Sequence, residues 1–184
     1  MKLILASNSP RRKDILLAAG YDFSVVKSNF EEITDIKDPI ERARYFAEQK
    51  AEEVFSRLSG DVVVIGADTL VFIGDNILGK PKDAADAYNT LKFLSGKTHN
   101  VVTGYAVITK DKKIISDEVT EVTFSDLPDE LIKTYVQSGL PLDKAGSYGI
   151  QDGFPLVKSY RGSFNNIVGL PMEAIDKIIK PLLK

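Results

Sequence analysis

The chain has 184 residues, of which 43% are hydrophobic and 27% charged, values that suit one globular domain spanning 1–184 rather than a disordered chain. The formal net charge is −2, whereas a nonspecific nucleic-acid binder would carry a strong basic excess, so we expect no nucleic-acid partner. No apolar run approaches the roughly 20 residues that span a bilayer. Cysteine is absent, which excludes disulfides and thiolate metal sites.

The N-terminal segment lacks a signal-peptide pattern, because only residues 3–6 are apolar before a polar, basic stretch begins. Together with the absence of cysteine, this favours a cytoplasmic protein without a membrane partner.

The first expected elements are a strand followed directly by a helix. A continuous apolar run predicts a short buried strand at 2–7. Ser9 is a good N-cap and Pro10 suits the first helical position. Gly20 suits the position just past the end of this helix.

The later elements follow from similar patterns. Asp38-Pro39 starts a second helix, whose apolar positions keep helical spacing as far as Leu58. Residues 62–65 and 69–73 read as one extended strand that ends in a hairpin turn at 74–76. Further helices are expected at 83–94, 128–138 and 171–183, and further strands at 101–109, 113–124, 147–150, 156–159 and 165–168. This order predicts an α/β fold with a mixed β-sheet flanked by helices.

The turn from the first strand into the first helix is a candidate anion site. The first N–H groups of a helix have no intrahelical partner, and the helix dipole makes that end partly positive. Ser7 and Ser9 add hydroxyl groups there, and Arg11 and Arg12 add two guanidinium groups suited to phosphate oxygens. The alternative is a capped surface helix with solvated arginines. A Walker P-loop is excluded, because its motif is absent.

Acidic residues supply a second set of candidates. Asp68 follows a strongly apolar strand segment, where a carboxylate could hold a divalent cation or accept a proton from water. The alternative is an ordinary aspartate in a tight turn. Glu31 and Glu32 form an acidic pair that could bind a hard cation, although adjacent acids more often lie in a solvated loop.

Two lysines, a glutamine and the single histidine complete the candidates. Lys50 lies beside the apolar stripe of the second helix and Lys80 just before the third, and either could neutralise phosphate charge in a transition state. Gln151 ends a glycine-containing stretch, and its amide could read the edge of a base. His99 reads as structural, at the start of a strand.

A series of motifs, in family order from residue 5 to residue 171, resembles the Maf family of nucleoside triphosphate pyrophosphatases. The motifs are Leu5-Ala6-Ser7-Asn8-Ser9-Pro10-Arg11-Arg12, Gly66-Ala67-Asp68-Thr69, Gly79-Lys80-Pro81, Leu94-Ser95-Gly96-Lys97-Thr98-His99, Thr103-Gly104, Pro141-Leu142-Asp143-Lys144-Ala145-Gly146-Ser147-Tyr148-Gly149-Ile150-Gln151 and Val168-Gly169-Leu170-Pro171. The resemblance implies an elongated α/β fold shared with the inosine triphosphate pyrophosphatases, often as a homodimer. It also implies hydrolysis of a nucleoside triphosphate to the monophosphate and pyrophosphate, with Mg²⁺ or Mn²⁺.

The resemblance assigns roles by position. Asp68 matches the proton acceptor, and the positions tied to substrate choice are Arg11, Thr69 and Gln151. The polar ring around the phosphates corresponds to Ser7, Arg12, Glu31 or Glu32, Lys50 and Lys80. We expect Glu31, Glu32 and Asp68 to supply the metal ligands.

The end of the long motif is similar to the subgroup that acts on dTTP and UTP. Two positions depart from the subgroup, since Asp152 stands where glycine is usual and Phe164 where tyrosine is expected. Modified pyrimidine nucleotides are a further possible substrate class. The alternative from another class is a nucleotide-binding regulator of cell division or septum formation in which catalysis is not essential.

Overall fold

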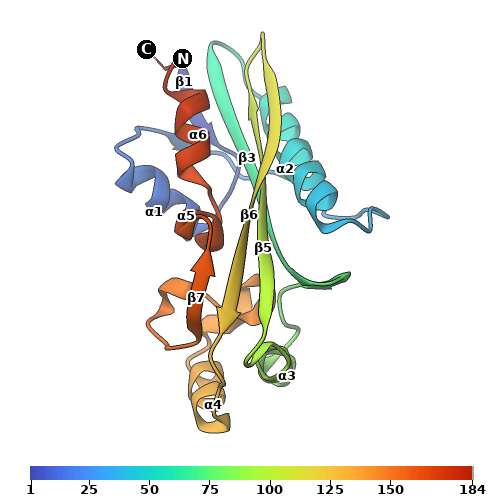
Figure 1. Ribbon diagram of the computed structural model, residues 1–184. Coiled ribbons are helices and arrows are strands. Elements are labelled where there is room, and N and C mark those ends of the chain that lie inside the picture. Colours follow the sequence, from blue (N-terminus) through green and yellow to red (C-terminus); the bar gives the residue numbers. More distant parts are fainter. Residues whose placement is uncertain (184) are drawn as a thin grey trace.

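Three long strands form the central part of the computed structural model, which describes residues 1–183 (Figure 1). They are β3 (Val62–Ile73), β5 (Thr98–Ile108) and β6 (Lys113–Phe124), and neighbouring pairs among them are antiparallel. The shorter strands are β1 (Lys2–Leu5), β2 (Ser24–Val25), β4 (Asn76–Leu78) and β7 (Val157–Arg161). The sheet has the order β2-β1-β3-β5-β6-β7, with β4 paired to β3, and the β1 pairings are parallel. The expected mixed sheet is therefore confirmed.

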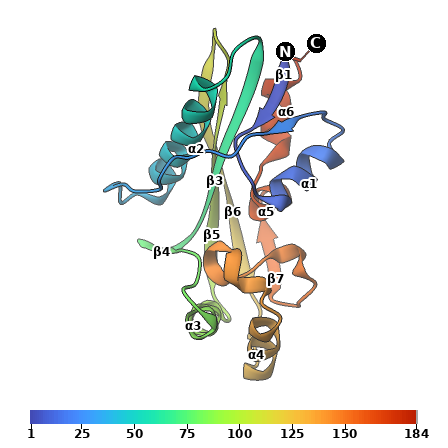
Figure 2. The same ribbon diagram turned by 180° about the vertical axis from the view of Figure 1, so that it is seen from behind.

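The helices cover both faces of the sheet at one end and gather around its other end (Figures 1 and 2). They are α1 (Pro10–Ala18), α2 (Pro39–Ser56), α3 (Ala84–Leu94), α4 (Asp129–Gln137), α5 (Phe164–Val168) and α6 (Met172–Ile179). Helix α2 lies on one face of the sheet, whereas α1 and α6 lie on the other. Among residues 1–183, no helix is long and apolar enough to cross a membrane.

Strand alternation explains why both faces are covered. Successive side chains of a strand point to opposite faces. Leu3 and Leu5 of β1 therefore enter a core with α1 and α6, whereas Ile4 enters a separate core with α2. Val63 and Val64 of β3 divide between the same two cores. A continuous apolar run, rather than an alternating one, is what a strand buried on both faces requires.

Helix α2 approaches the sheet closely because glycines lie beneath it. A Cβ atom added at Gly66 would clash with the backbone carbonyl of Ala47, and one at Gly104 would clash with that of Ala43. Only residues without a side chain allow the helix backbone to lie this near the strands. This packing determines which residues of β3 the following turn of α2 contacts.

A third core fills the other end of the molecule, around α3 and α4. Between α4 and β7 the chain makes three single turns of 3₁₀ helix, η1 (Leu140–Asp143), η2 (Ala145–Ser147) and η3 (Ile150–Asp152). The strand expected at 147–150 is therefore wrong. Gly146 and Ser147 both have positive φ, 67° and 61°, which turns the chain out of an extended path.

The strand expected at 165–168 is also wrong, because these residues belong to α5. Ser163 caps that helix, since its Oγ accepts a hydrogen bond from Asn166 N at 3.0 Å. The last helix is shorter than the expected 171–183 and ends at Ile179. The remaining expected elements are present within a few residues of their predicted bounds.

Candidate active site

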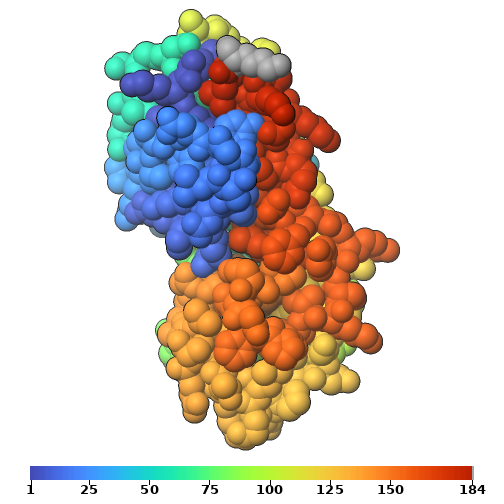
Figure 3. Space-filling view, turned by 90° about the vertical axis from the view of Figure 1, so that its left-hand side faces the viewer, coloured from blue at the N-terminus to red at the C-terminus, as the bar shows by residue number. Residues whose placement is uncertain are grey.

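A gap along one edge of β3 opens into a cleft. On that edge β1 pairs with β3 as far as Ile65, and β4 pairs with it from Val71. Within the described chain, β5 alone is the strand partner of residues 66–70. A cleft of about 690 Å³ opens there. In Figure 3 the N-terminal segment and the η1–η3 segment, both of which contribute to its lining, meet at the waist of the molecule.

Asp68 lies in the middle of the long strand β3, where the neighbouring strand changes, rather than at a strand end. It shares a face with Gly66, because the two residues are two positions apart in the strand. The close packing of α2 on Gly66 therefore places Lys50 against this aspartate. Lys50 Nζ lies 2.7 Å from Asp68 Oδ1 and 2.6 Å from Glu32 Oε1.

The two carboxylates differ in environment. Burial raises the pKa of Asp68, and the positive charge of Lys50 opposes that shift only in part. The other oxygen, Oδ2, is buried without a hydrogen-bond partner among residues 1–183. Burial alone would raise the pKa of Glu32 as well, but Lys50, followed by Lys80 and Arg12, lowers it overall. The pKa of Asp68 is thus raised and that of Glu32 lowered, although both carboxylates contact Lys50.

Helix α1 presents its N-terminus to the cleft, as the sequence predicts. Arg12 is held by three hydrogen bonds, from Nε to Gly169 O at 2.8 Å, from one terminal nitrogen to Ser7 Oγ at 3.1 Å, and from the other to Thr69 Oγ1 at 3.1 Å. Burial, only partly opposed by Asp68, lowers its pKa from a very high value. Arg12 is therefore an oriented cation rather than a solvated side chain.

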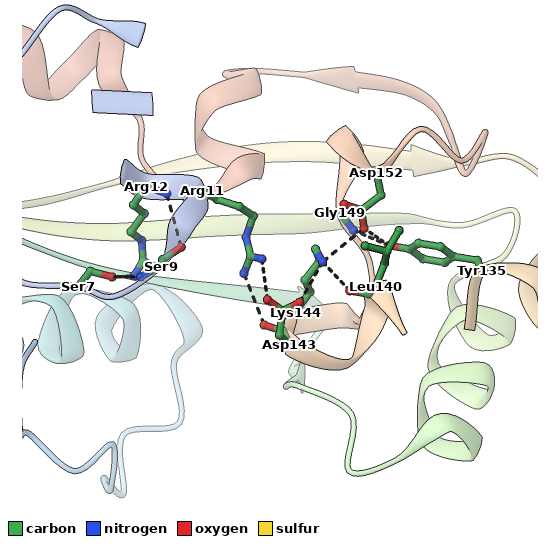
Figure 4. A network of polar contacts seen from close by, with 10 residues as sticks. All are labelled: Ser7, Ser9, Arg11, Arg12, Tyr135, Leu140, Asp143, Lys144, Gly149 and Asp152. Atoms are coloured by element: carbon green, nitrogen blue, oxygen red, sulfur yellow. Dashed lines mark hydrogen bonds and ion pairs between the residues drawn. The ribbon is translucent and has the colours of Figure 1, made fainter. Parts of the chain in front are cut away.

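Arg11 reaches across the cleft. It donates to Asp143 Oδ2 at 2.9 Å, and the two side chains come from α1 and η1, at opposite sides of the opening (Figure 4). Burial would raise the pKa of Asp143, but its bonds to Arg11 and Lys144 lower it to about 2. Asp143 is a contact that the sequence did not identify, although it lies within a recognised motif.

The cleft collects most of the predicted site residues. Its lining includes Ser7, Arg11, Arg12, Glu32, Lys50, Asp68, Thr69, Lys80 and Gln151. Glu31 is the exception, since it is exposed and does not line the cleft. Within residues 1–183 no three His, Cys, Asp or Glu side chains form a cluster suited to a metal ion.

One side of the cleft contains residues that were not predicted from the sequence. Arg42 and Phe46 of α2 line it together with Phe30. The two rings lie 6.0 Å apart, and the guanidinium of Arg42 lies 5.4 Å from the Phe46 ring centre. Phe46 is 2% exposed, and its position in the sequence gives no sign that it lies beside a cleft.

His99 is structural, as predicted. It is 1% exposed, and its Nε2 lies 2.8 Å from the hydroxyl of Tyr148. The rings of Phe124 and Tyr148 pack edge-on against it. Burial lowers its pKa to about 4, so the imidazole is neutral near pH 7.

Comparison with known structures and sequences places the chain in a family. A HAM1 protein from Coxiella burnetii shares the fold, with a TM-score of 0.52 at 14% identity, over 98% of this chain and 99% of that one. The model of the Maf-like proteins matches residues 2–182, and the chain belongs to the Maf family.

Curated relatives match over nearly the whole chain. The dTTP/UTP pyrophosphatase of Aquifex aeolicus is 46% identical over 183 residues, 99% of this chain and 96% of that protein. The dTTP/UTP pyrophosphatase of Thermococcus gammatolerans is 50% identical over 177 residues, 96% of this chain and 94% of that protein.

Proposed function

We propose that this protein hydrolyses dTTP and UTP to the nucleoside monophosphate and pyrophosphate in the β3 cleft. The observation that carries the proposal is Asp68, a buried carboxylate with one unpartnered oxygen in a cleft lined by arginines and lysines. Membership of the Maf family and the names of the Aquifex and Thermococcus relatives support the reaction and the substrates.

The triphosphate binds at the N-terminus of α1. The free N–H groups and the dipole of this nine-residue helix favour an anion. Arg12 is already oriented by Ser7, Thr69 and the carbonyl of Gly169, so little side-chain freedom is lost when phosphate oxygens bind. Arg11 exchanges its exposed partner Asp143 for a phosphate oxygen. Lys80 also lines the cleft, near enough to Glu32 to lower the pKa of that carboxylate.

Asp68 activates the attacking water. Its Oδ2 accepts a proton from water as the oxygen attacks the α-phosphorus, and the raised pKa makes this transfer more favourable near neutral pH. Lys50 holds Oδ1 and thereby orients the carboxylate. Lys50 and Lys80 then balance the negative charge that develops on the phosphoryl oxygens and on the leaving pyrophosphate.

The acidic residues of the cleft are suited to binding a divalent cation such as Mg²⁺. This ion is usually held by one or two carboxylates together with substrate phosphates and water, and it does not need a cage of three protein ligands. Glu32 and Asp68 contact the same Lys50 Nζ, at 2.6 Å and 2.7 Å, so the two carboxylates lie close enough together to share one ion. We propose these two residues, and not Glu31, as the ligands. When bound, the ion would neutralise phosphate charge.

Gln151 selects the base of the nucleotide. Gln151 lines the cleft from η3, and its amide can donate to one carbonyl of uracil or thymine and accept from the ring N–H. Cytosine and the purines present a different order of donors and acceptors. A site built on such hydrogen bonds can discriminate strongly.

Pyrophosphate release across the common ribonucleoside and deoxyribonucleoside triphosphates, with Mg²⁺ and with Mn²⁺, tests the proposal. We expect release from dTTP and UTP, dependence on the added cation, and little release from ATP or GTP. Equal hydrolysis of purine nucleotides would contradict the substrate assignment, and release of orthophosphate alone would contradict the bond assignment. The homodimer, the cytoplasmic location and the single-domain organisation remain predictions, which sedimentation, cell fractionation and limited proteolysis test.

A further inference from the structure

The hydroxyl group of Tyr135 holds both ends of the turn that carries Gln151 (Figure 4). Tyr135 lies on α4 and is fully buried. Its Oη accepts a hydrogen bond from Gly149 N at 2.9 Å and donates one to Asp152 Oδ2 at 2.5 Å. Gly149 precedes the 3₁₀ turn η3 and Asp152 is its last residue, so Gln151 lies between the two anchored positions.

Asp152 is held from a second side by Lys144. The Nζ atom of Lys144 lies 3.4 Å from Asp152 Oδ2, and these two side chains are 8% and 7% exposed. The same Nζ donates to Leu140 O at 2.5 Å and to Asp143 Oδ1 at 2.9 Å. A buried carboxylate is tolerated only when charges and donors surround it in this way. Burial, reinforced by the bond to Asp152, raises the pKa of Tyr135, so its hydroxyl keeps the proton that it donates.

Gly149 brings the Gln151 amide into contact with this cluster. A Cβ atom added at Gly149 would lie 2.7 Å from Gln151 Nε2, 2.8 Å from Lys144 Cε and 2.9 Å from Asp152 Cγ. The amide therefore lies directly over the glycine, beside the buried lysine and aspartate. Gln151 itself is exposed, so the turn beneath it, rather than packing around it, determines where its amide points.

We infer that Tyr135 and Asp152 are positioning residues for base recognition, which fix the η3 turn so that the Gln151 amide meets the edge of a uracil or thymine ring. Neither side chain needs to touch the nucleotide. The inference rests on the proposed function, and it assigns a purpose to Asp152, the residue that departs from the subgroup pattern. Loss of either anchor leaves the phosphate-binding half of the cleft intact but lets the amide move.

The experiment compares UTP with CTP. Cytosine carries an amino group in place of the C4 carbonyl of uracil and an acceptor nitrogen in place of the ring N–H, so donors and acceptors are exchanged at these two positions. Pyrophosphate release and the binding of non-hydrolysable α,β-imido analogues of both nucleotides are measured for the wild type, Tyr135→Phe, Asp152→Ala and Asp152→Asn. In Tyr135→Phe and Asp152→Ala we expect the preference for UTP over CTP to fall about tenfold, the effect of one hydrogen bond. The change appears in KM and in analogue binding, with kcat for UTP affected much less. Asp152→Asn keeps an acceptor oxygen for Tyr135 and retains most of the preference.

Tyr88→Phe is the matched control, since it removes a hydroxyl from a half-buried tyrosine that packs on the same core but does not line the cleft. It should keep the preference. An unchanged preference in Tyr135→Phe and Asp152→Ala would overturn the inference, and so would a loss of kcat with the preference intact. If Tyr135→Phe does not fold, the two Asp152 variants decide. If the wild type binds the UTP analogue more tightly than the CTP analogue but releases no pyrophosphate, the proposed function alone is refuted. If the wild type binds the two analogues equally, the inference is refuted.

Discussion

Lys50 of α2 and Asp68 of β3 form a buried ion pair, with 2.7 Å between Nζ and Oδ1. The pair lies beside two glycines, Gly66 and Gly104, that allow the helix backbone to contact the sheet. Gly66 lies two residues before Asp68 on the same face, and Gly104 lies directly opposite Asp68 on β5. The position of the charged pair thus depends on backbone packing, and changes in that packing should alter the chemistry.

Gly66→Ala tests this dependence. The new methyl group meets the carbonyl of Ala47 and must push α2 away, which should lower the free energy of unfolding by about 1–3 kcal/mol. Pyrophosphate release should fall as well, because Lys50 moves with the helix. Urea denaturation and an activity assay measure the two effects. Gly79→Ala is the control for the stability measurement alone, since a Cβ atom there has no neighbour within 4 Å. Equal stability of both variants would contradict this account of the packing.

Lys50→Gln should change the pH dependence of the reaction. The charge of Lys50 lowers the pKa of Asp68 against the larger effect of burial, so its removal lets that pKa rise further. Asp68 must be ionised to accept a proton. The acidic limb of the kcat/KM profile should therefore move to higher pH in the variant. Lys82→Gln, an exposed change outside the cleft, should leave the limb in place. A limb that does not move in Lys50→Gln would mean that another group controls it.

Arg11→Ala should weaken nucleotide binding more than turnover. A hydrogen bond to a charged group contributes about 1.5–3 kcal/mol, so KM for dTTP should rise about 10- to 100-fold. Steady-state kinetics separate KM from kcat. Lys13→Ala removes a charge from the same helix at a position that does not line the cleft, and its KM should stay near that of the wild type. Similar KM values for the two variants would indicate only a general effect of charge.

His99 should make the protein less stable in mild acid. Its pKa is 6.5 in an unfolded chain and about 4 when buried, so the unfolded state binds more protons between these values. Burial of the neutral imidazole therefore contributes to the free energy of unfolding in full above pH 6.5, and this contribution is lost as the pH falls towards 4. It amounts to roughly 3 kcal/mol. His99 is the only histidine, which simplifies the measurement.

Urea denaturation at several pH values, for the wild type and His99→Gln, isolates this contribution from that of the carboxylates. The stability difference between the two proteins should shrink as pH falls from 6.5 to 4. A constant difference would show that the pKa of His99 is the same in the folded and unfolded states, and would contradict the effect of burial.

Much of the fold could be predicted from local patterns. Ser9-Pro10 and Asp38-Pro39 marked helix starts correctly, because cap chemistry acts over a few residues. The strand expected at 147–150 failed, since Ser147 has a positive φ, which residues other than glycine rarely adopt and which its residue type does not indicate. Residues 165–168 are short and apolar, and such segments do not distinguish a strand from a single helical turn.

The candidate site was predicted in parts rather than as a whole. Arg11 and Arg12 stood out by their place at a helix start, whereas Lys50 and Asp68 gained significance only through the family resemblance. Their contact depends on glycines in two strands. A glycine inside a strand often indicates that another backbone, here that of a helix, packs closely against the strand. The Tyr135–Asp152 contact joins a helix to a turn and depends on side-chain burial, which residue patterns do not provide.

Asp68→Asn tests the central claim most directly. The wild type and the variant are compared for pyrophosphate release from dTTP and UTP at saturating Mg²⁺, with thermal unfolding to confirm that both are folded and Asp75→Asn as an exposed control. If Asp68 is the general base of this cleft, turnover by Asp68→Asn should fall about 10²–10⁴-fold while Asp75→Asn stays unchanged. Turnover near that of the wild type in folded Asp68→Asn protein would contradict the account.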